Sequence, residues 1–330
     1  KKIAVFTGTR ADYGLLYWLI KEIENDITLK LLLIISGSHL SPEYGLTNNY
    51  IKKDKIKITE TIETLVSSNT PVGSLKSMGL GIISYSETIN RLKPNLIVIL
   101  GDRYEALAIA QVALILKIPI LHIHGGDVSY GAYDDSIRHA ITKLSSIHCV
   151  ANKDAYKRVL QLGENKKFVF NVGAPGLEYV KRVKFLSKSE LKRKFKFNFD
   201  LPYFLITFHP ETLSENKNSL EILLSSLECF KDFNMVFTYP NVDDGSFEII
   251  NRLSKFQKEN ISSIFLIKSF GHINYLSVMK SAELIIGNSS SGIIEAPSMN
   301  IPSINVGDRQ KGRVSAKSVL HCRIEKKQII

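Results

Sequence analysis

Short aliphatic runs bounded by Gly, Pro or Asn alternate along the chain with longer amphipathic stretches. In the first half, the aliphatic runs predict strands and several of the stretches between them predict helices. The strands are expected at 3–7, 29–36, 96–100, 118–123 and 147–151, and the helices at 14–25, 104–116, 135–145 and 153–162. Continuous apolar strands that alternate with helices are typical of a parallel sheet covered on both faces.

The same pattern restarts after residue 200. Strand-like runs recur at 203–208, 235–239, 264–268, 283–287 and 302–306. The expected fold is therefore α/β, with two doubly wound Rossmann-like domains, residues 1–180 and 181–330, that face a cleft.

A basic stretch at 181–199 marks the expected boundary and carries much of the net charge of +11. Such a stripe can bind the phosphates of a nucleic acid. Its spacing of Phe185, Leu191 and Phe195, however, gives it the apolar face of an ordinary surface helix. We therefore expect no nucleic-acid partner, and the remaining positive charge suits a small anionic ligand such as a nucleotide diphosphate.

The lengths of the apolar runs also indicate the cellular compartment of the protein. None reaches the roughly 18 residues that span a membrane, so no membrane partner is expected. The apolar stretch Ile3–Phe6 is too short for a signal peptide, which favours a cytoplasmic protein. The three cysteines, Cys149, Cys229 and Cys322, have neither metal-ligand nor disulfide-framework spacing.

Ligands of doubly wound sheets bind outside the carboxyl ends of the strands, and the unusual residues of this chain lie there. The first strand runs into TGTRADYG, where Gly8 permits a turn and Arg10 lies near a helix start that favours anions. A simple strand–helix turn stays open as an alternative. The loop lacks the dinucleotide fingerprint, so NAD or FAD is not expected.

Carboxylates follow the next two strands. LGDRYEALA places Asp102 and Arg103 after a buried strand, HIHGGD carries Asp127, and Asp134 lies at a helix start in YDDSIRH. Neighbouring carboxylates separate their pKa values into acid and base roles, although Asp102 and Arg103 could merely cap a helix. His122 and His124 are expected on one strand face, and no Cys/His pair completes four ligands, so no metal is expected.

The second half offers hydrogen-bond donors. In IIGNSSSGIIEAPS, residues Ser289, Ser290, Ser291 and Gly292 predict a donor-rich nest for a diphosphate at a helix N-terminus. A helix cap would explain only one of these serines. Glu295 could bind a ribose diol. Further polar residues of this half follow other strands, namely His209 in FHPETLS, Asn241 in TYPNVDDG, and Arg309 and Arg313 in NVGDRQKGR.

Seven motifs in order, covering nearly the whole chain, resemble the hydrolysing UDP-N-acetylglucosamine 2-epimerases of bacterial sialic-acid synthesis. They are TGTRADYG, LGDRYEALA, HIHGGD, YDDSIRHAITKLS, FHPETLS, GNSSSGIIEAPS and NVGDRQKGR. The resemblance implies a fold like that of the GT-B glycosyltransferases, with a UDP-sugar bound between the domains. It also implies no metal or redox cofactor, and a homodimer or homotetramer.

The reaction implied by the resemblance releases UDP and yields N-acetylmannosamine. A base removes the C2 proton as UDP leaves C1, which gives 2-acetamidoglucal. Water then adds at C1, and a proton returns to C2 from the opposite face. Proton transfer on two faces requires more than one acid or base.

By motif, the resemblance assigns catalysis to Asp102, Asp127, Asp134 and His209. It assigns UDP-sugar binding to Arg10, Arg103, His209, Asn241, Ser289, Ser290, Glu295 and Arg309, and it places Phe270 beside the uracil. Family members usually have glutamate where this chain has Asp127. They also have a last helix beyond the position of Ile330, which is expected to be absent here.

Several related functions stay open. A related epimerase acts on UDP-2,4-diacetamido-2,4,6-trideoxyglucose in legionaminic-acid synthesis, and loops such as 37–50 and 69–80 would distinguish its substrate. A non-hydrolysing epimerase is less consistent with the GDR and HGG motifs. A UDP-sugar glycosyltransferase would use the same fold, whereas a nucleotide-sugar sensor would need no catalytic carboxylates.

Overall fold

The computed structural model describes residues 1–66, 68, 70–130, 132–211, 218–240 and 245–330. Its internal contacts divide the chain into two units. Unit 1 comprises Lys1–Val128 and Tyr133–Pro175, and unit 2 comprises Ser129–Ala132 and Gly176–Ile330. The short segment from Ser129 belongs to unit 2 because Arg313 Nη2 donates to Ser129 Oγ at 3.2 Å and Tyr130 N donates to the Lys311 carbonyl at 3.5 Å.

Unit 1 contains a seven-stranded parallel sheet in the order β3-β2-β1-β4-β5-β6-β7. Its strands are β1 (Lys2–Thr7), β2 (Lys30–Ser36), β3 (Ile58–Ile62), β4 (Leu96–Leu100), β5 (Ile120–Ile123), β6 (Ile147–Val150) and β7 (Val169–Asn171). Its helices are α1 (Arg10–Asn25), α2 (Asn48–Lys53), α3 (Pro71–Leu92), α4 (Tyr104–Ile115), α5 (Asp134–Leu144) and α6 (Lys153–Gln161), with 3-10 turns at Gly37–Leu40, Pro42–Tyr44 and Lys166–Phe168.

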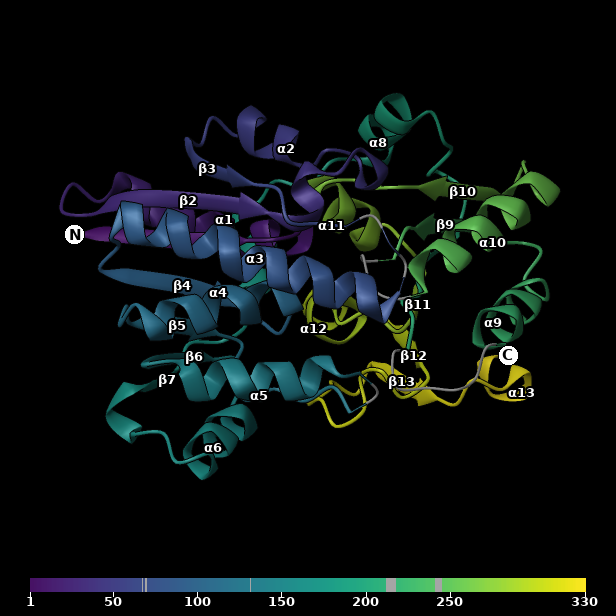
Figure 1. The fold of residues 1–330 in the computed structure, drawn as a ribbon. Coiled ribbons are helices and arrows are strands. Elements are labelled where there is room, and N and C mark those ends of the chain that lie inside the picture. The colour runs from purple at the N-terminus through teal and green to yellow at the C-terminus, as the bar shows by residue number, and fades with distance from the viewer. Residues whose placement is uncertain (67, 69, 131, 212–217, 241–244) are drawn as a thin grey trace. The chain divides into compact units, whose positions relative to one another are not determined.

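Both faces of the central part of this sheet are buried, which explains why its central strands are largely apolar. Along β1, Ala4 and Phe6 pack with residues of α3, α4 and α5. Figure 1 shows these three helices on one face of the sheet. Ile3 and Val5 point to the opposite face and pack with α1. This period of two places both sets of side chains in a core, so the sheet is doubly wound as expected.

Unit 2 repeats the arrangement with six parallel strands in the order β10-β9-β8-β11-β12-β13. Its strands are β8 (Tyr203–Thr207), β9 (Asn234–Thr238), β10 (Ile264–Ile267), β11 (Leu284–Gly287), β12 (Ser303–Val306) and β13 (Val319–Cys322). Its helices are α7 (Gly176–Arg182), α8 (Lys188–Phe195), α9 (Ser219–Leu227), α10 (Ser246–Glu259), α11 (His272–Lys280), α12 (Ser291–Ser298) and α13 (Lys326–Ile329).

The structure corrects two local predictions. Residues 69–80, expected as a loop, mostly form the first turns of α3, which Thr70 caps by accepting a hydrogen bond from Gly73 N at 3.1 Å. The basic stretch 181–199 is not one helix, because α7 ends at Arg182 and α8 begins only at Lys188. Of its expected apolar face, only Leu191 is fully buried.

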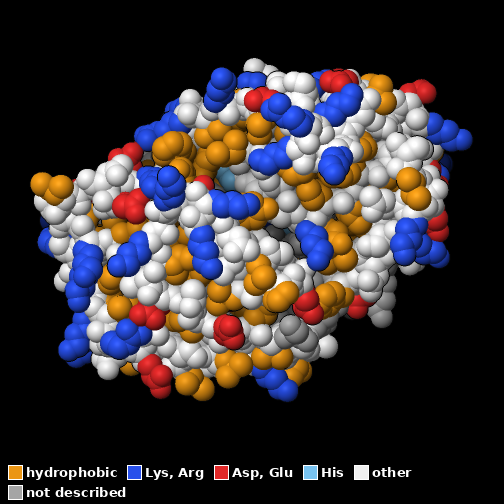
Figure 2. Space-filling view, turned by 90° about the horizontal axis from the view of Figure 1, so that it is seen from above, with side chains coloured by type: hydrophobic (Ala, Val, Ile, Leu, Met, Phe, Trp, Pro, Cys, Tyr) orange, Lys and Arg blue, Asp and Glu red, His pale blue; other side chains and the backbone are white. Residues whose placement is uncertain are grey.

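The surface chemistry is mixed. Figure 2 shows Lys and Arg side chains scattered over one face of the molecule among apolar and acidic groups, rather than gathered into one stripe. No helix within the described residues is long and apolar enough to cross a membrane.

Candidate active site

The turn after β1 positions Arg10 at the first residue of α1. Thr9 and Asp12 form a capping box, in which Thr9 Oγ1 accepts from Asp12 N at 3.2 Å and Asp12 Oδ2 accepts from Thr9 N at 3.0 Å. Burial raises the pKa of Asp12 to about 6, and the nearby Arg103 guanidinium opposes part of that shift. Arg10 is therefore held at the anion-favouring end of a helix, beside a carboxyl group that titrates near neutral pH.

The turns after β1 and β2 pack closely against the first turn of α4 in unit 1. Gly37 has a φ of +57°, and a Cβ on it would lie 2.8 Å from the Gly8 carbonyl oxygen and 3.2 Å from Glu105 Oε1. Glu105 is only 3% exposed and accepts a hydrogen bond from Arg103 Nε at 3.2 Å. The buried carboxylate thus anchors Arg103, a role for Glu105 that the motif alone did not indicate.

Asp102 lies in the turn after β4 and is paired with a buried guanidinium. Arg138, which is 1% exposed, donates from Nη2 to Asp102 Oδ2. Arg138 Nη1 lies 3.8 Å from Asp135 Oδ1. Because α5 starts at Asp134 and carries Arg138 one turn on, Asp135 of its first turn and Asp102 lie at the same guanidinium. The sequence placed Arg138 in the motif without giving it a role.

His122 supports the same turn from within the sheet. It is fully buried, with Nε2 2.7 Å from the Gly101 carbonyl oxygen and Nδ1 3.2 Å from Thr142 Oγ1. Burial lowers the pKa of His122 to about 4, so the ring is neutral near pH 7. Since a carbonyl only accepts, Nε2 carries the hydrogen and holds the residue preceding Asp102.

His124, unlike His122, lies outside strand β5. Strand β5 ends at Ile123, and His124 has a φ of +64°, so the prediction that the two histidines share a strand face is wrong. His124 Nδ1 lies 2.9 Å from Asp127 Oδ2, and Asn152 Nδ2 donates to Asp127 Oδ1 at 2.9 Å. The described residues contain no group of three or more His, Cys, Asp or Glu that could hold a metal ion.

In unit 2, a buried amide fixes the loop that carries His209. Asn288 is fully buried, and its Oδ1 accepts from His209 N at 2.7 Å while its Nδ2 donates to the His209 carbonyl at 2.8 Å. The Asn288 carbonyl in turn accepts from Arg309 Nη1 at 3.3 Å and from Gln310 Nε2 at 3.0 Å. Asn288 therefore ties the loops after β8 and β12 to the end of β11.

The serines follow Asn288 and lie half-buried at the start of α12. Ser289 Oγ and Ser291 Oγ are 3.0 Å apart, and the Tyr275 hydroxyl lies 2.7 Å from Ser291 Oγ. Ser290 makes no side-chain cap. Within the described residues, the backbone N–H groups of Ser289 and Ser290 have no hydrogen-bond partner. Two free amides therefore lie beside linked hydroxyls, with Gly292 buried behind them, and binding of a diphosphate there stays a prediction.

Other predicted residues of unit 2 are placed less directly. Glu295 is buried on α12, one turn after the serines. Phe270 is 1% exposed and packs against Phe195 with ring centroids 4.8 Å apart, so its ring presents no open face and contact with a uracil stays a prediction. Asn241 lies outside the described residues.

Glu211 was quoted within a motif but given no role. Its Oε1 accepts a hydrogen bond from Asp308 N at 3.0 Å. Burial raises the pKa of Glu211, and backbone hydrogen bonds from Asp308 and Arg309 oppose that shift. Glu211 therefore holds the loop that carries Arg309.

The chain was compared with known proteins. A family model described as UDP-N-acetylglucosamine 2-epimerase matches residues 21–330. A Campylobacter jejuni protein named GDP/UDP-N,N'-diacetylbacillosamine 2-epimerase (hydrolyzing) is 42% identical over 326 residues, covering 98% of this chain and 85% of the relative. A Neisseria meningitidis UDP-N-acetylglucosamine 2-epimerase is 36% identical over 331 residues, covering 100% of this chain and 85% of the relative.

The fold is also found in solved structures. The crystal structure of Methanocaldococcus jannaschii UDP-GlcNAc 2-epimerase in complex with UDP-GlcNAc and UDP superposes with a TM-score of 0.81 at 20% identity, over 99% of this chain and 90% of that one. This similarity confirms the expected fold of two Rossmann-like units. The sequence matches show that the chain belongs to the hydrolysing UDP-N-acetylglucosamine 2-epimerase family.

Proposed function

We propose that this protein converts UDP-N-acetylglucosamine and water into UDP and N-acetylmannosamine. The observation that supports this most is that two pairs of ionisable groups follow the adjacent strands β4 and β5, namely Asp102 with Arg138 and His124 with Asp127. A glycosyltransferase has no need of several proton-transfer groups at this place, whereas epimerisation at C2 requires at least two.

The two units supply complementary chemistry for this reaction. The C2 hydrogen of the sugar is not acidic, so departure of the diphosphate must lead. The free amides of Ser289 and Ser290, with Arg309, would stabilise the charge that develops on the leaving UDP. The groups of unit 1 would then remove one proton from C2 and return another on the opposite face. No step requires a metal or a redox cofactor.

A second substrate has a specific observation in its favour. The 42% identical relative is named for N,N'-diacetylbacillosamine, a sugar with a second acetamido group at C4 and no 6-hydroxyl. The corresponding UDP-sugar would undergo the same elimination and hydration, because the chemistry concerns only C1 and C2. The two substrates differ only in what surrounds C4 and C6.

Proton NMR in heavy water tests the reaction and the substrate together. The purified protein is incubated separately with UDP-N-acetylglucosamine and with the UDP-2,4-diacetamido sugar. The expected result is free 2-epimeric sugar with deuterium at C2 and one UDP released per sugar, and the faster substrate identifies the physiological one. Release of UDP without inversion at C2, or turnover only with an added acceptor, would contradict the proposal.

We also propose that the protein is a homodimer or homotetramer. Helix α3 leaves Val72, Leu75, Leu80 and Ile83 exposed, a run of apolar side chains that is unusual on a surface helix. Sedimentation equilibrium measures the mass directly. A monomer at micromolar concentration would contradict this part of the proposal.

A further inference from the structure

His124 uses only one of its two ring nitrogens within the protein. Nδ1 lies 2.9 Å from Asp127 Oδ2, whereas Nε2 makes no hydrogen bond among the described residues. The side chain is 11% exposed, so the ring is mostly shielded from water. When a carboxylate accepts from Nδ1–H, the neutral ring keeps its lone pair on Nε2, which can then accept a proton.

Asp127 is poorly placed to accept that proton itself. Its two oxygens are both engaged, one with His124 Nδ1 and the other with Asn152 Nδ2, and the residue is 7% exposed. To reach a substrate, its side chain would have to give up one of these bonds. The observed contacts instead make Asp127 the group that orients a neighbouring base, as in other base–orienter pairs.

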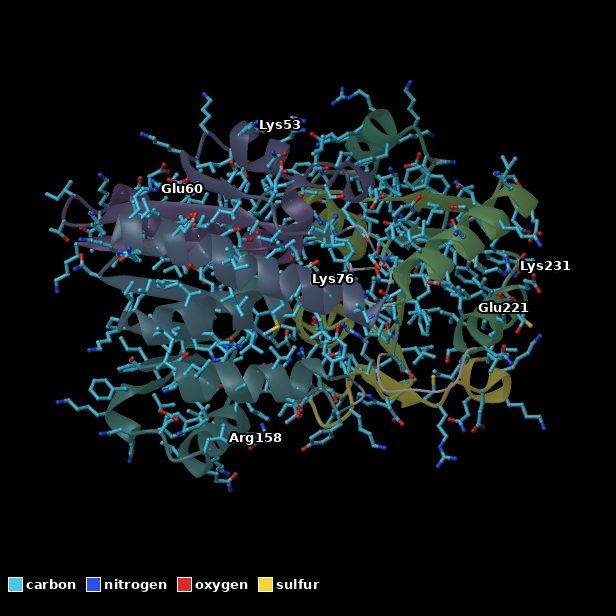
Figure 3. All side chains as sticks on the ribbon, viewed as in Figure 1. Lys53, Glu60, Lys76, Arg158, Glu221 and Lys231 are labelled. Atoms are coloured by element: carbon cyan, nitrogen blue, oxygen red, sulfur yellow. The ribbon has the colours of Figure 1, made fainter. Side chains whose placement is uncertain are left out.

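The backbone holds His124 in a conformation that a non-glycine residue rarely adopts. Its φ of +64° lies in the left-handed region, and such residues concentrate at functional sites. The loop is fixed on its far side, where Arg158 of α6, labelled in Figure 3, donates from Nη1 to the Gly126 carbonyl. A Cβ on Gly126 would lie 2.4 Å from the Ala155 carbonyl oxygen, so the loop packs directly on α6.

We propose that His124 Nε2 is the base that removes the C2 proton, and that Asp127 is a positioning residue. This inference rests on the proposed function. The Nε2 lone pair forms a bond to the C2 hydrogen while the C2–H electron pair becomes the C1=C2 double bond. UDP leaves with the C1–O bonding pair. The resulting imidazolium is stabilised by the Asp127 carboxylate, and the shorter aspartate suits a partner within its own loop.

The decisive variant is His124→Gly, because glycine adopts a positive φ without strain. The assay separates the two half-reactions. Elimination is followed as UDP release from the UDP-sugar, and hydration is followed by supplying 2-acetamidoglucal together with UDP. Removing one general base costs typically about 10²–10⁴-fold, so we expect kcat for elimination to fall by about 10³-fold with KM nearly unchanged. Hydration of the glucal should stay within about threefold of the wild-type rate, a factor worth less than 1 kcal/mol.

A matched histidine–carboxylate pair provides the control. His139 Nε2 lies 3.6 Å from Asp135 Oδ2 on α5, and His139→Asn should leave both half-reactions near wild-type rates. His124→Gly that loses hydration as well as elimination would show a purely structural role, and one that keeps both would exclude His124 from the reaction. Either result overturns the proposal. Failure of the wild-type protein to process any UDP-sugar would instead refute the proposed function.

Discussion

The two units hold their functional residues by different means. In unit 1, Asp102 is paired with the buried Arg138, and Asp127 with His124, so ionisable groups are fixed by other ionisable groups. In unit 2, the neutral Asn288 fixes His209, and uncharged hydroxyls and amides line the start of α12.

This difference indicates a division of labour. A site that moves protons needs groups whose charge can change, whereas a site that binds a permanent anion works best with fixed donors that do not titrate. Substitutions in unit 1 should therefore act on turnover, and those in unit 2 on binding of UDP.

The largest effect is expected from Asp102→Asn. Loss of this carboxylate should lower kcat by about 10³-fold, because a proton-transfer or charge-stabilising group of this kind contributes typically 10²–10⁴-fold. The affinity for UDP, measured by isothermal titration calorimetry, should change less than about twofold, because the amides proposed to bind the diphosphate, those of Ser289 and Ser290, lie in unit 2.

Asp135→Asn is the matched control for this variant. Asp135 also faces Arg138, but at 3.8 Å and on the helix itself, so its loss should cost less than about tenfold in kcat. Since Arg138 is nearly fully buried, Asp102→Asn should also lower stability by about 3 kcal/mol, and assays belong well below its melting temperature. A wild-type rate in Asp102→Asn would remove Asp102 from the mechanism.

The central architecture could be predicted because it follows from buried strands. Most strands inside the two sheets are largely apolar runs, and each interior strand was expected within a few residues. The three strands that were missed, β3, β7 and β13, all lie at sheet edges. There the exposed positions are polar or mixed, so the apolar signal is weak. Edge strand β10 was found because IFLI is apolar throughout.

Helix α3 was missed for another reason. It contains Gly73, Gly79 and Gly81, residues that disfavour helix by local propensity. The structure shows why Gly81 is tolerated, since an added Cβ would lie 2.9 Å from Tyr85 Cε2 and 3.5 Å from the Ala108 Cβ of α4. Close packing between α3 and α4 outweighs the low helix propensity of glycine here. Such packing cannot be read from one sequence.

For the candidate site, the sequence located the loops but not the partnerships within them. The strand–loop pattern placed Asp102, Asp127, His209 and the serines at strand ends, where the structure has them. It could not pair Asp102 with Arg138 or His209 with Asn288, because these partners are 36 and 79 residues apart. Such contacts are set by tertiary packing, which no local pattern encodes.

Acid should destabilise unit 1 through a buried histidine. His39 of unit 1 is fully buried between Thr7 Oγ1 and Thr47 Oγ1, each 2.9 Å from a ring nitrogen, and burial lowers its pKa to about 3. Below pH 6.5, His39 therefore binds a proton in the unfolded chain but stays neutral in the folded chain until the pH is much lower. The contribution of the neutral His39 to the free energy of unfolding is therefore complete above pH 6.5 and is lost as the pH falls. Between pH 6.5 and 5 the loss is about 2 kcal/mol.

The measurement compares urea unfolding of wild type and His39→Gln at several pH values. The wild-type curve should fall more steeply with acid than that of the variant. Asp12 contributes with the opposite sign, because its pKa is raised to about 6 and its stabilisation is lost as pH rises, so only the difference between the two proteins is informative. Parallel curves would show that His39 does not govern the acid response of unit 1.

Smaller effects are expected from the hydroxyl groups of unit 2, beginning with the double variant Ser289→Ala/Ser291→Ala. Each hydroxyl adds a neutral hydrogen bond, whereas the free amides of Ser289 and Ser290 remain, so Kd for UDP should rise only about tenfold, or 1.4 kcal/mol. Tyr275→Phe, which removes only the hydroxyl 2.7 Å from Ser291 Oγ, should cost about twofold. An unchanged Kd in the double variant would show that the two hydroxyls do not contribute to UDP binding. If kcat/KM falls more than UDP affinity, the hydroxyls act on the charge that develops as the diphosphate departs, and the division between binding and catalysis is incomplete.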